Sequence, residues 1–261
     1  YVRAVVDPQS WRARCVVAYL DEPPYFMPVA GSTPTGCDIE LTEMVLGALG
    51  VSEIEYTLTT FGELIDGVRT RRWHLNTPMF ITAERAKLVR YSRPVWAAID
   101  GFIVRTDDDR DVTSYEAVAA DDSIRLAAVT GQIQLATALD TGTPRHRIVE
   151  FDDQDAAAQA VLDGQVDASV STAPGNAAYV TRLGDPRLRS VPDERAGDRG
   201  DLAFGAFSFD RESHGLADAF DEQLGTTLGT DEHLAMMSSY GFDEGSLRAA
   251  LDGAGHDSAG C

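Results

Sequence analysis

Lysine is almost missing from this chain. Lys87 is the only lysine among 22 basic residues, which face 42 acidic ones and leave a formal net charge of -20. A field of that sign repels phosphate backbones and anionic head groups, which argues against nucleic acid and anionic lipid as partners. We interpret the acidic excess as a solvated surface of a kind that suits high salt.

Cysteine is scarce, and the spacing of the three residues present is uninformative. Cys15, Cys37 and Cys261 include no C-x-x-C pair, so we expect no structural zinc site. Cys15 stands at the start of the apolar run Cys15 to Leu20, which indicates a small thiol buried in the core. The cysteines therefore do not indicate whether the protein works in an oxidising or a reducing compartment.

Long apolar runs and a leader segment are also missing. No run approaches the roughly 18 residues that a membrane span needs. The start, Tyr1 to Asp7, has neither the basic beginning nor the apolar stretch of a signal peptide, which fits a cytosolic protein or a trimmed secreted chain. With 261 residues, 44% hydrophobic and 25% charged, the chain can form one large globular domain or two lobes.

Catalytic signatures are absent as well. The sequence has no G-x-S-x-G, no H-E-x-x-H and no P-loop, and no G-x-G-x-x-G follows a predicted strand. We therefore expect neither an enzyme nor a cofactor nor a metal. The five histidines show no metal-ligand spacing, so we interpret each as a surface or packing residue: His74, His146, His214, His233 and His256.

What the sequence does contain is an alternation of strand and helix that runs twice. β-branched runs indicate strands, and apolar residues at helical spacing indicate helices. Two such series predict an α/β protein of two lobes with largely parallel sheets. In the first series we expect strands at 14–20, 54–58, 74–80 and 99–104, and helices at 36–50 and 61–70. In the second we expect strands at 125–129, 148–151, 166–171 and 203–209, and helices at 114–120, from Gly131, at 154–162, 213–228 and 231–240.

Aromatic and ionic side chains gather in the loops after the first three strands. Glu22 and Tyr25 follow the first strand, Phe61 opens the second helix, and Phe80 ends the third strand, with Arg85 five residues later. Loops beyond the carboxyl ends of parallel strands converge on one crevice. There an arginine can hold a carboxylate and aromatic faces can hold a cation. Taken singly, a phenylalanine is more often a core residue and an arginine a solvated one.

Three segments stand in a characteristic order: Gly36-Cys-Asp-Ile-Glu-Leu41, Phe61-Gly-Glu-Leu-Ile-Asp-Gly-Val68 and Met79-Phe-Ile-Thr-Ala-Glu-Arg-Ala-Lys-Leu-Val-Arg-Tyr-Ser-Arg-Pro94. They resemble the motifs G-F-D-x-D-L, F-x-x-L-I-P-x-L and M-x-I-T-P-E-R-x-x-x-V-x-F-S-x-P of the solute-binding proteins of polar amino-acid ABC transporters. The likeness continues through 166–168 to 240–242. Within the family the chain is most similar to ectoine-binding members, through residues 22–25, 79–82 and 166–172.

The resemblance implies a ligand site, carried over position by position. Arg85 corresponds to the arginine that binds the ligand carboxylate, and Glu22 would face the cationic part of the ligand. Backbone N–H groups at the start of a helix in the second lobe would also meet the carboxylate. The residues expected there are Thr130, Gly131, Gln132 and Ile133, and the aromatic walls would be Tyr25, Phe61 and Phe80.

Two positions depart from the family pattern. Thr172 stands where amino-acid binders usually place an aspartate that pairs with the α-ammonium group, so an ordinary amino acid would lose its strongest amine contact. The segment 71–78 differs from the family form G-x-x-D-x-x-x-x-G, with Pro78 in place of a glycine. The roles of Asn76 and Thr77 are therefore carried over less directly, and of the two Thr77 is included among the ligand-binding candidates.

The resemblance also implies the architecture: an α/β, two-lobed, periplasmic-binding-protein-like type II fold with two hinge crossovers. Lobe one is expected from residues 1–102 with 208–261, lobe two from 103–207, and the hinge near 101–104 and 204–209. Such a protein would be an extracytoplasmic, monomeric receptor that delivers a small zwitterionic solute to the membrane permease of an ABC importer. We favour a compact zwitterion with a delocalised or quaternary cation, such as ectoine or a betaine.

Three alternatives stay open at this point. A polar amino acid is the other ligand class for the same fold. A dehydratase-like enzyme of this fold would need an acid–base pair in the cleft, where Glu22 is the only acid that we can place. A ligand-sensing module of a receptor is the third, and an adjacent kinase or membrane segment in the gene would reveal it.

Overall fold

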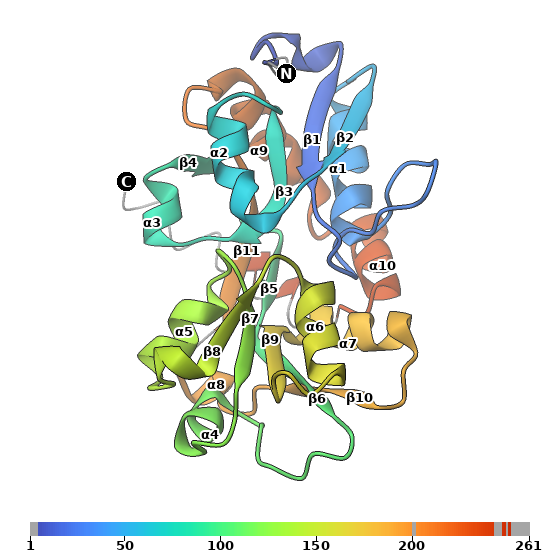
Figure 1. Ribbon diagram of the computed structural model, residues 1–261. Coiled ribbons are helices and arrows are strands. Elements are labelled where there is room, and N and C mark those ends of the chain that lie inside the picture. Colours follow the sequence, from blue (N-terminus) through green and yellow to red (C-terminus); the bar gives the residue numbers. More distant parts are fainter. Residues whose placement is uncertain (1–4, 200–201, 243–246, 249, 252–261) are drawn as a thin grey trace.

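The chain forms two β-sheets that are joined by two passes of the backbone (Figure 1). A computed structural model describes residues 5–199, 202–242, 247–248 and 250–251. The first sheet has six strands and the second has five. We call the half built on the first sheet lobe one and the half built on the second sheet lobe two.

Lobe one is a mixed sheet with helices packed against it. Its strands are β1 (Cys15–Tyr19), β2 (Ile54–Leu58), β3 (Leu75–Phe80), β4 (Val89–Tyr91), β5 (Trp96–Ala98) and β11 (Ala203–Asp210). Its helices are η1 (Ser10–Arg12), α1 (Cys37–Ala48), η2 (Phe61–Glu63), α2 (Leu64–Arg69), α3 (Ala83–Ala86), α9 (His214–Thr227) and α10 (Asp231–Ser239). The strand order is β2-β1-β3-β11-β4, and β5 also pairs with β11. β1 runs parallel to β2 and β3, whereas β11 runs antiparallel to β3, β4 and β5.

Lobe two repeats this plan with five strands. They are β6 (Asp100–Arg105), β7 (Leu126–Val129), β8 (Ile148–Phe151), β9 (Ala168–Thr172) and β10 (Leu188–Pro192), in the order β10-β6-β9-β7-β8. The helices are α4 (Tyr115–Ala120), α5 (Gln134–Asp140), η3 (Arg145–Arg147), α6 (Gln154–Leu162), α7 (Ala173–Leu183) and α8 (Ala196–Arg199). β7 is parallel to β8 and β9, and β6 is antiparallel to β9 and β10.

The two-lobed α/β class predicted from the sequence is confirmed, and the expectation of largely parallel sheets holds for all but one described strand in each sheet. In lobe one β11 runs against the rest, since β3, β4 and β5 are each antiparallel to it. In lobe two β6 does so, since β9 and β10 are both antiparallel to it. These two strands carry the chain into a sheet from the other lobe. A strand that arrives across a lobe boundary needs no helical crossover, so it can run in either direction.

The strands change sheet at two places. β5 ends at Ala98 in the first sheet and β6 begins at Asp100 in the second, while β10 ends at Pro192 in the second and β11 begins at Ala203 in the first. The predicted lobe boundaries after residues 102 and 207 fall inside β6 and β11. The division into 1–102 with 208–261 and 103–207 remains a prediction about which residues move together.

Each lobe has its own apolar core. Lobe one packs a single large cluster, whereas lobe two has one cluster on each face of its sheet. Phe102 and Ile103, neighbours on β6, belong to different clusters because successive side chains of a strand point to opposite faces. Cys15 is fully buried in the core of lobe one, as predicted, and Cys37 is buried in the same cluster; Cys261 lies outside the described residues.

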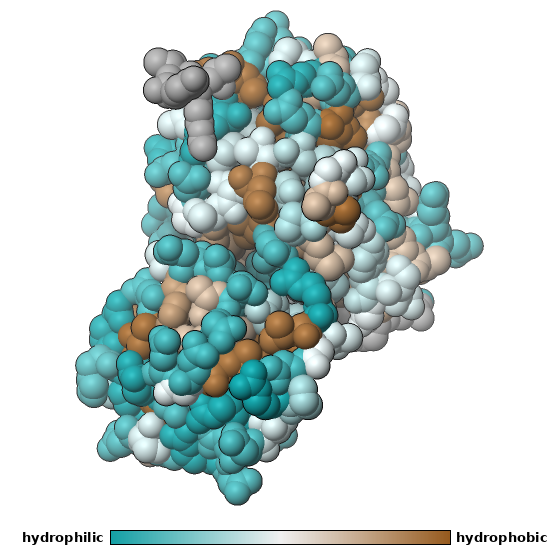
Figure 2. Space-filling view, turned by 45° about the vertical axis from the view of Figure 1, so that its right-hand side comes forward, coloured by the Kyte–Doolittle hydropathy of each residue, from teal (hydrophilic) through white to brown (hydrophobic). Residues whose placement is uncertain are grey.

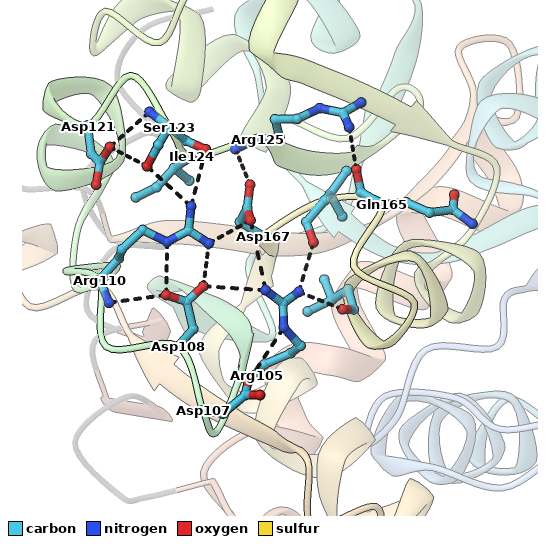
Figure 3. A network of polar contacts seen from close by, with 12 residues as sticks. Arg105, Asp107, Asp108, Arg110, Asp121, Ser123, Ile124, Arg125, Gln165 and Asp167 are labelled. Carbon is cyan, nitrogen blue, oxygen red and sulfur yellow. Dashed lines mark hydrogen bonds and ion pairs between the residues drawn. The ribbon is translucent and has the colours of Figure 1, made fainter.

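Arginines cross-link carboxylates on the surface of lobe two (Figure 3). Arg110 Nη2 lies 2.5 Å from both Asp108 Oδ2 and Asp167 Oδ1, and Arg105 approaches the same two carboxylates at 3.8 and 3.9 Å. The Arg110 guanidinium holds the pKa of Asp108 below its usual value. The network ties the loop after β6 to Asp167, just before β9. Elsewhere the face seen in Figure 2 is mostly hydrophilic, with apolar residues in small separate groups.

Candidate ligand-binding site

Residues from both lobes enclose a small cavity at the lobe boundary. This inner cavity has a volume of about 30 Å³. Its aromatic walls come from lobe one, and its polar lining from lobe two consists of two glutamines and a threonine. The lining residues are Glu22, Tyr25, Phe26, Phe61, Pro78, Met79, Phe80, Trp96, Gln132, Ile133, Gln134 and Thr172. Seven of the eleven predicted site residues therefore meet in one place.

The loop after β1 presents Glu22 and Tyr25. A tight turn forms because the amides of Tyr25 and Phe26 donate to the Glu22 carbonyl and the Glu22 amide donates to the Phe26 carbonyl. Gly36 packs directly behind this turn: with φ of 130°, a Cβ there would lie 2.3 Å from the Tyr25 carbonyl oxygen. The glycine that opens α1 therefore allows the loop to lie against the helix start. Phe242 packs edge-on against the Tyr25 ring, 5.7 Å between centroids.

Glu22 is a buried carboxyl with neutral partners. It is 8% exposed, and its oxygens accept from Ser171 Oγ at 3.3 Å and from Gln132 Nε2 at 3.4 Å. Burial raises the pKa of Glu22 to about 7, and these two hydrogen bonds only partly oppose the shift. Within the described part of the chain no basic side chain forms an ion pair with it. A cationic group that entered the cavity would therefore meet an acidic side chain that has no charged partner.

Aromatic rings enclose the same space. Phe80 and Trp96 pack edge to face with centroids 5.4 Å apart, and Tyr25 lies 4.8 Å from Trp96. Phe61, in η2, is half-buried and also lies under the guanidinium of Arg85, 5.0 Å from Cζ to the ring centroid. Ring faces in this arrangement can hold a diffuse cation.

Arg85 bridges the two lobes beside the cavity. Thr82 caps α3 by accepting from the Arg85 amide, which fixes the start of the short helix. Arg85 Nη1 donates to the Phe80 carbonyl and Nη2 to the Gly131 carbonyl of lobe two, both at 2.8 Å. Its side chain is buried beside the cavity without lining it, and burial lowers its pKa. The predicted contact with a ligand carboxylate stays a prediction.

The segment before α5 differs from its expected form. The helix begins at Gln134, not at Gly131, and Gly131 adopts φ of +84° in a turn. Gln132 and Ile133 line the inner cavity, whereas Thr130 is exposed and its amide donates to the Phe151 carbonyl. The helix start was predicted too early because Gly131 was taken as its opening residue; a glycine at positive φ belongs to the preceding turn.

The two predicted threonines have different positions. Thr172 lines the cavity, where its Oγ1 accepts from Tyr25 Oη at 3.2 Å and caps α7 by accepting from the Gly175 amide at 3.1 Å. Thr77, in β3, is fully buried outside the cavity lining, and its Oγ1 has no hydrogen-bond partner among the described residues. The three residues that follow it on β3, Pro78, Met79 and Phe80, do line the cavity.

Sequence reasoning missed several residues of the site, above all Trp96 and Ser171. Trp96 follows Pro94, the last residue of the third motif, by two positions, and Ser171 directly precedes Thr172. Both lie next to residues that were singled out, so proximity to a motif was the available signal. Neither position reveals from sequence alone that its side chain points toward the cleft.

A larger outer chamber adjoins the inner cavity. It has a volume of about 430 Å³ and shares Glu22, Phe61 and Gln132 with the inner cavity. Six of its lining residues are acidic and none is basic: Asp21, Glu22, Glu63, Asp152, Asp153 and Asp155. Asp21 forms an ion pair with Arg182 of lobe two, and Glu63 forms one with Arg72. These two arginines partly neutralise the negative charge of the chamber lining.

The described residues contain no group of three His, Cys, Asp or Glu side chains that could hold a metal ion. Over the same ranges, no helix combines the length and apolar character that crossing a membrane requires. The side chains that line the two cavities offer recognition by acidic, aromatic and amide groups.

Comparison with known proteins gives consistent matches. Residues 15–242 match the bacterial extracellular solute-binding proteins, family 3. A curated relative, the probable amino-acid ABC transporter periplasmic-binding protein y4tE of Sinorhizobium fredii (strain NBRC 101917 / NGR234), is 32% identical over 222 residues, which are 83% of this chain and 73% of the relative.

Solved structures share the fold. EhuB in complex with hydroxyectoine superposes with a TM-score of 0.82 at 22% identity, over 92% of this chain and 91% of that one. A mutant of ArgBP from T. maritima superposes with a TM-score of 0.73, also at 22% identity, over 88% and 95% of the two chains. At such identity these likenesses extend to the two-lobed architecture.

Proposed function

Because the chain belongs to the bacterial extracellular solute-binding proteins of family 3, we propose that it captures a small zwitterion with a diffuse cation, of the ectoine or betaine type. Membership of this family implies the general role: a small solute as ligand, an amino-acid-type ABC permease as partner and a location outside the cytoplasm. The nature of the solute is the proposal. The receptor role is one of binding and delivery, without chemical change of the solute.

The main support for this proposal is the environment of Glu22. A carboxylate taken out of water without a cationic partner is costly, and among the described residues the Glu22 carboxylate has only Ser171 and Gln132 as partners, both neutral. A ligand cation would supply the missing opposite charge. Since both partners belong to lobe two, the acid faces the space where the lobes meet, which is where a solute would be enclosed.

The shape of the cationic group follows from what surrounds Glu22. A compact ammonium group is best held by converging oxygen acceptors, whereas a quaternary or delocalised cation is best held by ring faces. The inner cavity offers the rings of Tyr25, Phe80 and Trp96, and Thr172 supplies a hydroxyl where amino-acid binders place a carboxylate. This combination supports a diffuse cation over the α-ammonium group of an ordinary amino acid.

The negative end of the solute would be held beside Arg85. Its guanidinium has five N–H donors, and the carbonyls of Phe80 and Gly131 accept from two of its nitrogens. When the lobes separate, the bond to Gly131 breaks and the freed N–H can donate to a carboxylate instead. The inner cavity of about 30 Å³ is tight, so a solute that filled it would require the lobes or the lining side chains to move apart.

A basic amino acid is the second candidate, and the outer chamber favours it. A solute that placed its α-carboxylate near Arg85 could extend a cationic side chain toward the acidic lining, where Asp152 and Asp153 face about 430 Å³. In this second candidate the aromatic walls would contact the aliphatic part of the side chain.

A thermal-shift screen tests the proposal directly. We expect ectoine, hydroxyectoine or glycine betaine to raise the melting temperature, because a ligand at 100 times its dissociation constant adds about 2.7 kcal/mol of stability. Glu22→Gln, which keeps the shape of the side chain and one acceptor oxygen but removes the charge, should lose most of the shift. A shift with arginine but with none of the three compatible solutes would replace the proposal by the second candidate.

A further inference from the structure

Trp96 extends the aromatic lining beyond the residues that the sequence singled out. Its indole is 4% exposed and lines the inner cavity together with Phe80 and Tyr25. The centroid distances of 5.4 and 4.8 Å place the three rings in direct contact. Trp96 therefore forms a continuous wall with two residues already assigned to the site.

A buried carboxyl group fixes the orientation of this indole. Trp96 Nε1 donates to both oxygens of Asp38, at 3.0 and 3.3 Å. Asp38 is fully buried in the first turn of α1, so neither partner can turn toward water without leaving the other unsatisfied. The hydrogen bond thus determines which edge of the indole points into the core and which face remains for the cavity.

A glycine makes room for the ring. Gly205 of β11 pairs with Trp96 of β5, and a Cβ at position 205 would lie 2.3 Å from Cη2 of the indole. Every other residue at position 205 would push the ring off this surface. Asp38, Gly205, Tyr25 and Phe80 all belong to lobe one, so these contacts hold the indole within a single lobe.

We propose that Trp96 is a specificity-determining wall of the ligand cavity that selects solutes with a diffuse cation, and that Asp38 and Gly205 are positioning residues for its ring. This inference rests on the proposed function, because the cation is what the indole face would recognise. Tryptophan has the strongest attraction for cations among the aromatic side chains. Since its anchors lie in one lobe, the wall is in place before the lobes close, which reduces the ordering cost of binding.

Substitutions at two tryptophans separate recognition from packing. We expect Trp96→Leu to weaken binding of ectoine or glycine betaine, measured by calorimetry, about tenfold or more, because the ring face is lost. Trp96→Phe, which keeps a ring, should lose less. Trp73 is the matched control: it is also buried in lobe one, donates through Nε1 to a side chain, Asn76, and lies over a glycine, Gly67, but does not line the cavity. Trp73→Phe should leave the affinity unchanged.

Fluorescence tests the positioning role. The chain has three tryptophans, so a Trp11→Phe, Trp73→Phe protein reports on Trp96 alone. Saturation with a bound solute should change its emission. In that background Asp38→Asn retains an acceptor for the indole N–H and should preserve the response, whereas Asp38→Leu removes the acceptor and should reduce both the response and the affinity.

The outcomes distinguish two kinds of failure. If the wild-type protein binds neither ectoine nor glycine betaine, the proposed function fails and the role of Trp96 fails with it. If the wild type binds one of them while folded Trp96→Leu binds it equally well, only the role of Trp96 is overturned. Should Trp96→Leu not fold, the single-tryptophan protein decides, since an emission that stays constant at saturation contradicts contact with the solute.

Discussion

At the scale of single residues, the protonation of Glu22 links the ligand site to pH. Burial raises the pKa of Glu22 to about 7 from 4.5, so the folded protein binds a proton that the unfolded chain has already released. This contribution to stability is fully present below about pH 4.5 and is lost as the pH rises through about 7. A bound cation would counteract the loss by stabilising the ionised carboxylate.

We therefore expect the free energy of unfolding of the ligand-free protein to fall between pH 4.5 and pH 7.5 relative to Glu22→Gln. The difference should approach about 3 kcal/mol, from the size of the pKa shift. Chemical unfolding of both proteins across this range measures it. Parallel pH profiles for wild type and variant would show that Glu22 is not buried in the way described.

His74 should have the opposite pH dependence. Its Nδ1 accepts from the Val16 amide at 2.9 Å, which requires a neutral ring, and burial lowers its pKa below 6.5. The stability from the neutral ring is present above pH 6.5 and is lost as the pH falls through the lowered pKa of the folded state. His74→Asn keeps an acceptor near the Nδ1 position without titrating, so below pH 6.5 wild type should lose stability more steeply than this variant. An identical acid dependence of both melting temperatures would contradict the assignment.

At the scale of elements, the start of α1 shapes the ligand loop through Gly36. We expect Gly36→Ala to destabilise the fold by about 2–4 kcal/mol, because φ is positive there and the new methyl group meets the Tyr25 carbonyl. It should also weaken solute binding by displacing Tyr25.

The control for this prediction lies in the same helix. Gly47 of α1 has ordinary helical geometry, and a methyl group added there would meet no atom within 4 Å, so Gly47→Ala should stabilise the protein by about 0.5–1 kcal/mol. Unfolding curves of the two variants test both statements. Equal effects at positions 36 and 47 would mean that the loop is not held against the helix.

An element could be predicted where the sequence pattern that specifies it lies within a few residues, and not where it depends on pairing with a distant strand. Strand β1, helix α1, the loop that carries Glu22 and the end of β3 at Phe80 follow from periodicity and from motif spacing within a few residues. Trp96 could not be assigned in this way, because β5 has three residues and its place depends on pairing with β11, more than 100 residues away. Helix α7 was missed although Thr172 and Pro174 give it a capping residue and a proline in its first turn.

At the scale of the whole molecule, polar contacts between described residues join the lobes around the cleft. They connect Tyr25 with Thr172, Glu22 with both Ser171 and Gln132, Arg85 with Gly131, and Asp21 with Arg182. A neutral hydrogen bond or a partly exposed ion pair contributes about 1 kcal/mol, and a hydrogen bond to a charged group contributes about 1.5–3 kcal/mol. Contacts this weak can break when the lobes separate and form again around a solute.

We therefore expect a bound solute to compact the molecule. Small-angle scattering should give a smaller radius of gyration with a confirmed ligand than without it, while circular dichroism stays constant because the lobes move as units. Asp21→Asn, which removes the exposed rim pair without touching the inner cavity, should leave the ligand-bound radius unchanged. Identical scattering profiles with and without bound solute would contradict closure of the lobes on binding.

A crystal structure of the protein with ectoine or glycine betaine tests the central claim most directly. We predict the cationic group against the wall formed by Phe80 and Trp96, within about 6 Å of a ring centroid and facing the carboxylate of Glu22, with the carboxylate of the solute toward Arg85. A solute bound away from Glu22, or bound with its cationic group turned to bulk water, would contradict the account.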